Sequence, residues 1–179
     1  MQQTNFHGPP WPTPALWRAA NLAVAESIDR FSGAMVAAMD LGQRIRRRIE
    51  ALDDPMNDLC ARTCPDCQDP CCRRAKVWFD FKDLIYLHLG AMAIPTGQLI
   101  ASLNETCRYL SDKGCTLPRG QRPFVCTWYV CAAQKEHLHC LPRSGVQFLF
   151  NSLEALKAGR RQLENSFIQS VVPCSDSKS

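Results

Sequence analysis

The chain has 179 residues, of which 46% are hydrophobic and 21% are charged, with a formal net charge of +4. These values are typical of an ordinary globular protein with one core, and the mild charge argues against a nucleic-acid partner. The first residues lack the basic and apolar regions of a secretory signal peptide, and no segment has the roughly 20 apolar residues of a bilayer span. We therefore expect a cytoplasmic protein without a membrane partner.

The first third of the chain is expected to be mostly helical. Four prolines around Trp11 predict an irregular arm over residues 1–14. Apolar residues recur at intervals of three and four over 15–52, which predicts one long helix or two helices joined near Ser32-Gly33. The run Asp53-Asp54-Pro55 is expected to stop this helical segment.

Shorter elements are predicted after a cysteine loop over residues 56–76. Asp80 and Asp83 predict the N-terminal cap of a helix that ends before Pro95, and Thr96 predicts the cap of another short helix. A turn signal over 111–114 predicts a small hairpin or knuckle between the flanking cysteines.

The last third is expected to begin with irregular chain and to end in a helix. Three prolines in residues 116–143 predict mostly irregular structure, with one helical turn after Cys126. Helical spacing of apolar residues predicts a final helix from Ser144-Gly145 to about Val171. Residues 173–179 form a polar tail.

Cysteines are concentrated in the centre of the sequence. Five of the eleven lie between Cys60 and Cys72, in a run broken by prolines and polar residues, so that packing does not explain their density. The step C-x2-C lets two thiolates converge on one metal. The odd number of cysteines and the expected reducing compartment make disulfides the weaker interpretation. We predict a single metal-binding domain over 15–172, with a cysteine-rich centre over 60–131.

The directions of the adjacent Cys71 and Cys72 side chains affect how many metals the centre can bind. In an extended segment, adjacent side chains point to opposite sides, so these two thiols would serve two metals or two corners of a cluster unless the backbone turns sharply. A single structural zinc would use four ligands and leave the other thiols idle, whereas an iron–sulfur cluster or a two-metal site engages more of them. Zinc and iron both stay open at this point.

The order of the cysteines resembles that of a known family. The chain contains Cys64-x2-Cys67-x3-Cys71-Cys72, then CRYLSDKGCTL from Cys107, then Arg122-Pro123-Phe-Val-Cys126. This order is similar to that of the CxxCxxxCC cysteine-cluster family, whose YkgJ-like members are described as zinc- or iron-chelating bacterial proteins. Flagellin lysine N-methylases share the motif. The matching stretch covers about a third of the chain.

The resemblance implies a set of ligands. The cysteines it assigns to a metal or cluster are Cys64, Cys67, Cys71, Cys72, Cys107, Cys115 and Cys126. It also implies that Arg122 and Pro123 lie behind these ligands. The arginine would donate to thiolate or backbone acceptors and would reduce the negative charge of several thiolates.

Other sulfur and imidazole groups fall outside this pattern. Four cysteines lie outside it, namely Cys60, Cys131, Cys140 and Cys174. Cys131 is either an extra ligand or a buried thiol. We interpret His137 and His139 as surface histidines near Cys140, because the other cysteines already supply enough ligands. His7 and His88 are interpreted as surface or core residues.

Taken together, these patterns predict a mainly α, single helical domain around an irregular cysteine-rich metal-binding centre. The predicted function is that of a metalloprotein with an iron–sulfur cluster or iron, used for redox chemistry or an assisted modification reaction. The alternatives are a zinc-stabilised structural or interaction module and a small methyltransferase-like enzyme. The common catalytic motifs for nucleotide binding, zinc proteolysis and serine hydrolysis are missing from the sequence, so no catalytic residue is named and enzymatic activity stays open. The partner we expect is an unidentified protein.

Overall fold

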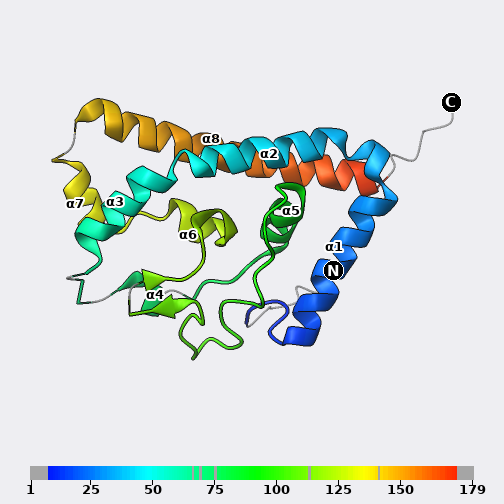
Figure 1. The fold of residues 1–179 in the computed structure, drawn as a ribbon, viewed down its shortest axis with the longest axis horizontal. Helices are drawn as coiled ribbons and strands as arrows, with labels where there is room; N and C mark the ends of the chain where they lie inside the picture. Colours follow the sequence, from blue (N-terminus) through cyan, green and yellow to red (C-terminus); the bar gives the residue numbers. More distant parts are fainter. Residues whose placement is uncertain are drawn as a thin grey trace, which may run out of the picture.

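The computed structural model describes residues 8–65, 67–68, 70–74, 76–112, 114–140 and 142–172, and the side chain of Cys71 lies outside this description. The fold is mainly α-helical, which confirms the predicted fold class (Figure 1). None of the described helices combines the length and the apolar character needed to cross a lipid bilayer.

The predicted N-terminal helical segment forms two helices. α1 (Pro14–Arg30) begins at Thr13, whose hydroxyl accepts a hydrogen bond from the Leu16 backbone N–H at 3.3 Å. A short 3-10 helix, η1 (Ser32–Ala34), joins it to α2 (Val36–Glu50). Of the two expected alternatives, the structure shows the second, two helices joined near Ser32-Gly33.

The residues expected to stop this segment instead begin another helix. The break falls at residues 51–52, and α3 (Asp53–Thr63) starts directly after it. Asp53 and Asp54 lie in the first turn, where carboxylates are favoured by the helix dipole, and Pro55 is tolerated there because that turn needs no intrahelical N–H. The prediction of a cysteine loop from residue 56 is therefore wrong for its first half.

The next predicted helix is confirmed, and the one after it is not found. α5 (Phe81–Leu89) begins with a capping box in which Asp80 and Asp83 each accept a hydrogen bond from the other's backbone N–H. Residues 96–106 form turns and bends, so the helix predicted at Thr96 is wrong. The Tyr109 hydroxyl accepts a hydrogen bond from the Gly97 backbone N–H at 3.1 Å and donates one to the Gly97 carbonyl at 2.9 Å. The Gly97 backbone groups thus have hydrogen-bond partners without a helix.

The cysteine-rich centre is built from short elements. The predicted hairpin is confirmed, with β1 (Leu110–Ser111) antiparallel to β2 (Gly114–Cys115). The helical turn predicted after Cys126 contains that residue, because α6 spans Phe124–Trp128. Three further elements were not predicted: α4 (Cys71–Arg74), η2 (Arg119–Gln121) and α7 (Ala132–Leu138). The backbone at Cys71-Cys72 is thus helical and not extended, so the argument that these thiols point to opposite sides does not apply.

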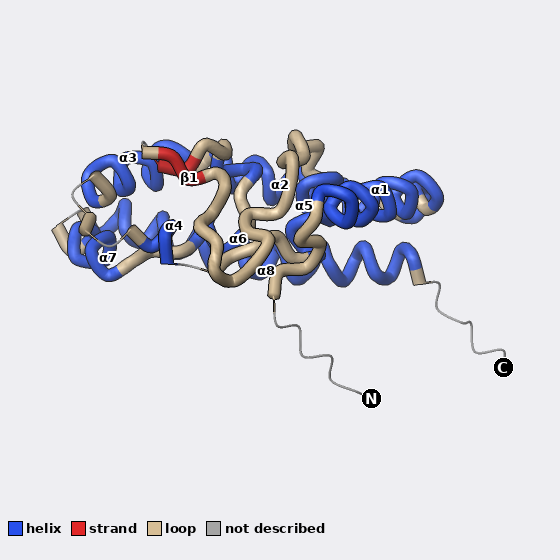
Figure 2. Tube along the Cα trace, turned by 90° about the horizontal axis from the view of Figure 1, so that it is seen from below, coloured by secondary structure: helices blue, strands red, loops and turns tan. Residues whose placement is uncertain are grey.

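The last helix supports the whole fold. α8 (Arg143–Val171) confirms the predicted C-terminal helix and packs against α2 and α5. Figure 1 shows α2 and α8 crossing the top of the molecule, and in the view from below in Figure 2 loops cross the middle of the molecule while the hairpin lies beside α3. We call α2, α5 and α8 the helical frame. Gly42 lets α2 approach the end of α5, because a Cβ there would lie 2.7 Å from the Leu89 backbone.

Two apolar clusters fill the interior. One lies within the frame and includes Ile45, Ile85, Leu156 and Leu163. The other joins α1 and α5 to the hairpin, and its buried members are Trp17, Val24, Phe79, Leu84, Leu87, Leu99, Tyr109 and Leu117. Three partly buried cysteines pack against this second cluster: Cys107, Cys115 and Cys126. These three thiols therefore lie at the edge of the second apolar cluster.

The described end of the N-terminal arm lies against this second cluster. Trp11 contacts Trp17 edge to face at 6.3 Å, and the amide of Gln98 donates to the Pro10 carbonyl at 2.9 Å. Residues 1–7 and the predicted polar tail over 173–179 lie outside the described residues. The proposed domain boundaries stay a prediction.

Candidate metal centre

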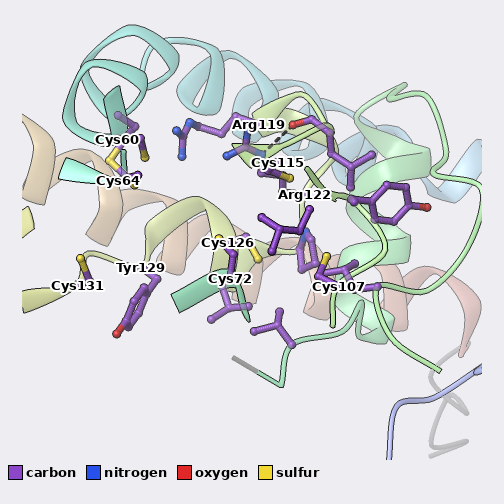
Figure 3. A pocket seen from close by; sticks show the side chains of 18 of the residues that line it. Cys60, Cys64, Cys72, Cys107, Cys115, Arg119, Arg122, Cys126, Tyr129 and Cys131 are labelled. Carbon is purple, nitrogen blue, oxygen red and sulfur yellow. Dashed lines mark hydrogen bonds between the residues drawn. The ribbon is translucent and has the colours of Figure 1, made fainter. Parts of the chain in front are cut away.

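A cavity of about 570 Å³ lies among α3, the hairpin, α6 and the start of α7 (Figure 3). Seven cysteine side chains line it: Cys60, Cys64, Cys72, Cys107, Cys115, Cys126 and Cys131. Apolar side chains, among them Val77, Leu99 and Leu117, form much of the remaining wall. We call this space the thiol cavity. It gathers cysteines from helices, a strand and a helix cap into one place.

The thiol cavity contains most of the predicted ligands. Five of them line it: Cys64, Cys72, Cys107, Cys115 and Cys126. Cys67 is half-buried but is not among the lining residues, and the side chain of Cys71 lies outside the description. The structure therefore brings together the cysteines from the loop, the hairpin and α6 that the sequence pattern assigned to one site.

Sequence reasoning left two of the cavity cysteines outside the pattern. Cys60 lies in α3 one helical turn before Cys64, the C-cap residue of that helix, so the two residues lie on the same face. This spacing could have identified Cys60, but residues 56–76 were predicted to be a loop. Cys131 is the N-cap residue of α7, and its capping partner Gln134 stands three residues later, which is a recognisable helix-start pattern.

Four of the thiols interact as one group. The pKa of Cys126 is raised to about 12, mainly by burial and also by the neighbouring thiols of Cys115, Cys72 and Cys107. Burial also raises the pKa of Cys107, with smaller contributions from Cys115 and Cys72. We call these residues the four-thiol group. Because low polarity and like charges both oppose ionisation, the raised pKa values of Cys107 and Cys126 mean that these two thiols resist deprotonation unless a cation is present.

The other thiols lie toward α3 and α7. Figure 3 shows Cys60 and Cys64 next to each other on one side of the thiol cavity. Burial raises the pKa of Cys64 to about 11, and the Cys60 thiol beside it adds to this shift. Gln134 connects this part of α3 to α7: its amide N–H donates to the Cys60 sulfur at 3.5 Å, and its amide oxygen accepts from the Cys131 backbone N–H at 3.1 Å.

Two arginines add positive charge to the cavity wall. Arg119 is only 3% exposed and donates from Nη2 to the Asn57 amide oxygen at 2.9 Å. Burial lowers the pKa of Arg119, while its interactions with Cys60 and Asp53 favour the charged guanidinium. Arg122 donates from Nε to the Leu117 carbonyl at 2.9 Å, and its charge opposes the rise in the pKa of Cys126.

Pro123 connects this arginine to the helix that carries Cys126. It directly precedes α6, and its carbonyl accepts a hydrogen bond from the Cys126 backbone N–H at 2.9 Å. Arg122 and Pro123 both line the thiol cavity. They therefore lie beside the candidate ligands.

The cysteine sulfurs fit a metal in type and number, but those that the structure describes are not arranged around one common point. Among the side chains that the structure describes, no group of three or more histidines, cysteines, aspartates or glutamates forms a ready-made metal site. The thiols surround the cavity, and none of the described cysteines is in a disulfide. Soft sulfur donors suit zinc, copper(I) and iron–sulfur clusters. Coordination would require several thiols to turn toward a common point.

None of the described histidines lines the thiol cavity, and neither does Cys140. His139 borders a separate hollow formed with Lys135, Leu138, Val146 and Phe150. Cys140 is exposed. His88 is half-buried and contacts the Asn21 amide oxygen at 3.1 Å, and burial lowers its pKa. His7 and Cys174 lie outside the described residues.

The comparisons with known proteins add no relative. No family model matches the chain, and no curated protein or solved structure matches it. The resemblance to the CxxCxxxCC family therefore stays an expectation based on the order of the cysteines.

Proposed function

We propose that the thiol cavity binds an iron–sulfur cluster or iron and that the protein uses this centre for redox chemistry or an assisted modification reaction. One observation carries the proposal: seven cysteine side chains from separate elements line a single cavity. Structural cysteines behave as small hydrophobes and have no reason to gather in this way. Thiolates are, in contrast, the standard ligands of iron–sulfur clusters.

The number of thiols favours a centre larger than one mononuclear ion. The four-thiol group alone supplies the four thiolates that hold a common iron–sulfur cluster or a tetrahedral zinc. Three more cysteines, Cys60, Cys64 and Cys131, line the same cavity. A single zinc would leave these three without a role, which supports a multinuclear centre.

The surroundings of the cavity support thiolate chemistry. Several thiolates close together accumulate negative charge, and the guanidinium groups of Arg119 and Arg122 at the wall would offset it. The apolar side chains around the cavity limit solvent access, which is one means by which proteins set the potential of a cluster. The two arginines and the apolar wall therefore suit a redox centre and would also shield a reactive centre from solvent.

A zinc-stabilised interaction module is the second candidate. It is favoured by the four-thiol group, which equals the ligand number of one structural zinc. A zinc held there would fix the hairpin and α6 to the second apolar cluster, since Cys107, Cys115 and Cys126 pack against that cluster. In this case the metal would stabilise the fold and carry out no chemistry.

Anaerobic purification followed by elemental analysis tests these proposals. We expect a coloured protein that contains iron, with or without acid-labile sulfide, and that bleaches in air as its thiolates and sulfide oxidise. Cys126→Ser should lower the bound metal, whereas Cys140→Ser, at an exposed cysteine that does not line the cavity, should not. A colourless protein with stoichiometric zinc would favour the second candidate. A metal-free wild type, or equal metal in both variants, would contradict both.

A further inference from the structure

Cys60 lies outside the cysteine pattern, yet polar side chains surround its sulfur. Its sulfur lies at the thiol cavity beside Cys64 and accepts a hydrogen bond from the Gln134 amide at 3.5 Å. The positive charge of the Arg119 guanidinium, which lines the same cavity, also attracts negative charge on this sulfur. Two polar groups from separate elements, η2 and α7, thus converge on one thiol at the end of α3.

Both of these polar groups are buried. Arg119 is 3% exposed and Gln134 is 5% exposed. A neutral thiol is a weak acceptor and does little to offset the desolvation of a buried guanidinium and a buried amide. A sulfur bound to a metal carries negative charge and accepts such hydrogen bonds far better, which is why groups behind metal ligands commonly donate to them.

The ion pair of Arg119 is a weak one. The Asp53 carboxylate lies 3.6 Å from Nε, and neither of these two atoms has a hydrogen-bond partner among the described residues. Asp53 is partly exposed, so solvent weakens its attraction to the buried guanidinium. A metal-bound sulfur at Cys60 would add negative charge next to Arg119.

Cys60 and Cys64 are also distinct from the four-thiol group. Figure 3 shows Cys60 and Cys64 together on one side of the cavity, away from Cys107, Cys115 and Cys126, and Cys72 acts electrostatically on both Cys64 and Cys126. Cys72 is the residue that the two sets have in common. This arrangement places one pair of thiols at the α3 side of the cavity and one group of thiols at the hairpin side.

We infer that the thiol cavity has a second metal position, held by Cys60 and Cys64 for a thiophilic metal ion, with Cys72 between this position and the four-thiol group. The inference rests on the proposed function, because it places a second ion in the same cavity. It assigns Cys60 as a ligand, and it assigns Arg119 and Gln134 as the residues that orient its sulfur and offset its charge.

Zinc binding to the reduced, metal-free protein tests this inference. Zn²⁺ serves as the probe, and bound zinc is counted by elemental analysis after the excess has been removed. We expect about two zinc ions per chain in the wild type and about one in Cys60→Ser, because this variant leaves only one thiolate, that of Cys64, at the second position. Cys140→Ser is the matched control and should bind as much as the wild type, while Cys126→Ser should lose the other ion.

A second readout needs no variant. Alkylation with iodoacetamide, followed by mass spectrometry of the wild type with and without Zn²⁺, should show Cys60 protected by zinc and Cys140 labelled equally in both samples. Equal labelling of Cys60 with and without zinc, or wild-type zinc content in Cys60→Ser, would overturn the second position. A wild type that binds no zinc in either experiment would overturn it together with the proposed metal centre, whereas zinc that is lost only in Cys126→Ser would overturn the second position alone.

Discussion

Asp83 of α5 forms a buried ion pair with Arg160 of α8. The same carboxylate accepts a hydrogen bond from the Phe124 backbone N–H at 2.9 Å, and the Arg160 guanidinium lies 4.5 Å from the centre of the Phe124 ring. Phe124 begins α6, the helix that carries Cys126. The ion pair therefore connects two helices of the frame to one wall of the thiol cavity.

Removing the charge of Asp83 should destabilise the protein strongly. Asp83→Asn leaves the Arg160 guanidinium buried without its main counter-ion, and breaking a buried pair in this way costs about 3–5 kcal/mol. Burial raises the pKa of Asp83 to about 6 and the Arg160 charge opposes this rise, so the carboxyl is ionised above that pH. Urea denaturation at neutral pH would measure the loss in the free energy of unfolding.

The control for this prediction lies on the same two helices. Lys82 and Glu164 form a partly exposed ion pair between α5 and α8, with a distance of 2.9 Å. Lys82→Ala should lower the free energy of unfolding by no more than about 1 kcal/mol, because solvent screens such pairs. Equal losses in Lys82→Ala and Asp83→Asn would contradict the special role of the buried pair.

Metal binding should strengthen as the pH rises. The pKa values of Cys64 and Cys126 are raised to about 11 and about 12, so both thiols are protonated at neutral pH in the metal-free protein. Metals bind thiolates, so each ligand must lose its proton and the apparent affinity should rise by up to about tenfold per pH unit for each proton released. Competition with a chelator at several pH values would measure this slope. An affinity that does not change with pH would show that these thiols are not ligands.

Chelation should loosen the cysteine-rich centre more than the helical frame. The hairpin and Cys126 pack against a small cluster with thiols at its edge, whereas α2 and α8 bury a separate apolar cluster. Structural metal sites contribute free energies of about 10–16 kcal/mol in zinc-finger peptides, so the loss should be large. Hydrogen exchange should show faster exchange over residues 107–126 after chelation and little change in the frame. A uniform change across the chain would contradict this division.

A methyl group at position 42 should disturb the contact between α2 and α5. In Gly42→Ala, the new Cβ would lie 2.7 Å from the carbonyl carbon and oxygen of Leu89, and backbone atoms cannot turn away as a side chain can. Overpacking of this kind costs about 1–3 kcal/mol.

The matched control for this substitution is Gly145→Ala, since a Cβ at position 145 has no neighbour within 4 Å. It lies in the first turns of α8, where alanine is a better helix former, so this variant should be neutral or slightly stabilised. Thermal unfolding of the two variants would compare them. A Gly42→Ala protein as stable as Gly145→Ala would show that the helices separate at little cost.

The long helices could be predicted because their signals are local. The spacing of apolar residues identified α1, α2 and α8, and the capping box of Asp80 and Asp83 identified the start of α5. The run Asp53-Asp54-Pro55 was misinterpreted because the same residues can end one helix or occupy the first turn of the next. The prediction of a helix at Thr96 was wrong for another reason. The Tyr109 hydroxyl, distant in sequence, forms hydrogen bonds with the Gly97 backbone.

The candidate site could be predicted only in part. The order of the cysteines named seven candidate ligands, and five of them line the cavity: Cys64, Cys72, Cys107, Cys115 and Cys126. Cys67 does not line it, and the side chain of Cys71 lies outside the description. The addition of Cys60 depends on α3 being a helix, and the placement of Arg119 and Gln134 against it depends on how η2 and α7 pack. No pattern in the sequence links residues 60, 119 and 134, because their proximity is a property of the tertiary fold.

The position of α8 at the end of the described chain has a consequence for biosynthesis. All seven cavity cysteines are synthesised before residues 143–171, which supply one apolar side of the frame through Leu156 and Leu163. Folding during synthesis begins from the N-terminal part, and α2 and α5 have no α8 to cover them until the last helix emerges from the ribosome. The frame can therefore close only after all of these cysteines have been made, so a chain that ended before α8 would carry the thiols without the helix that completes their support.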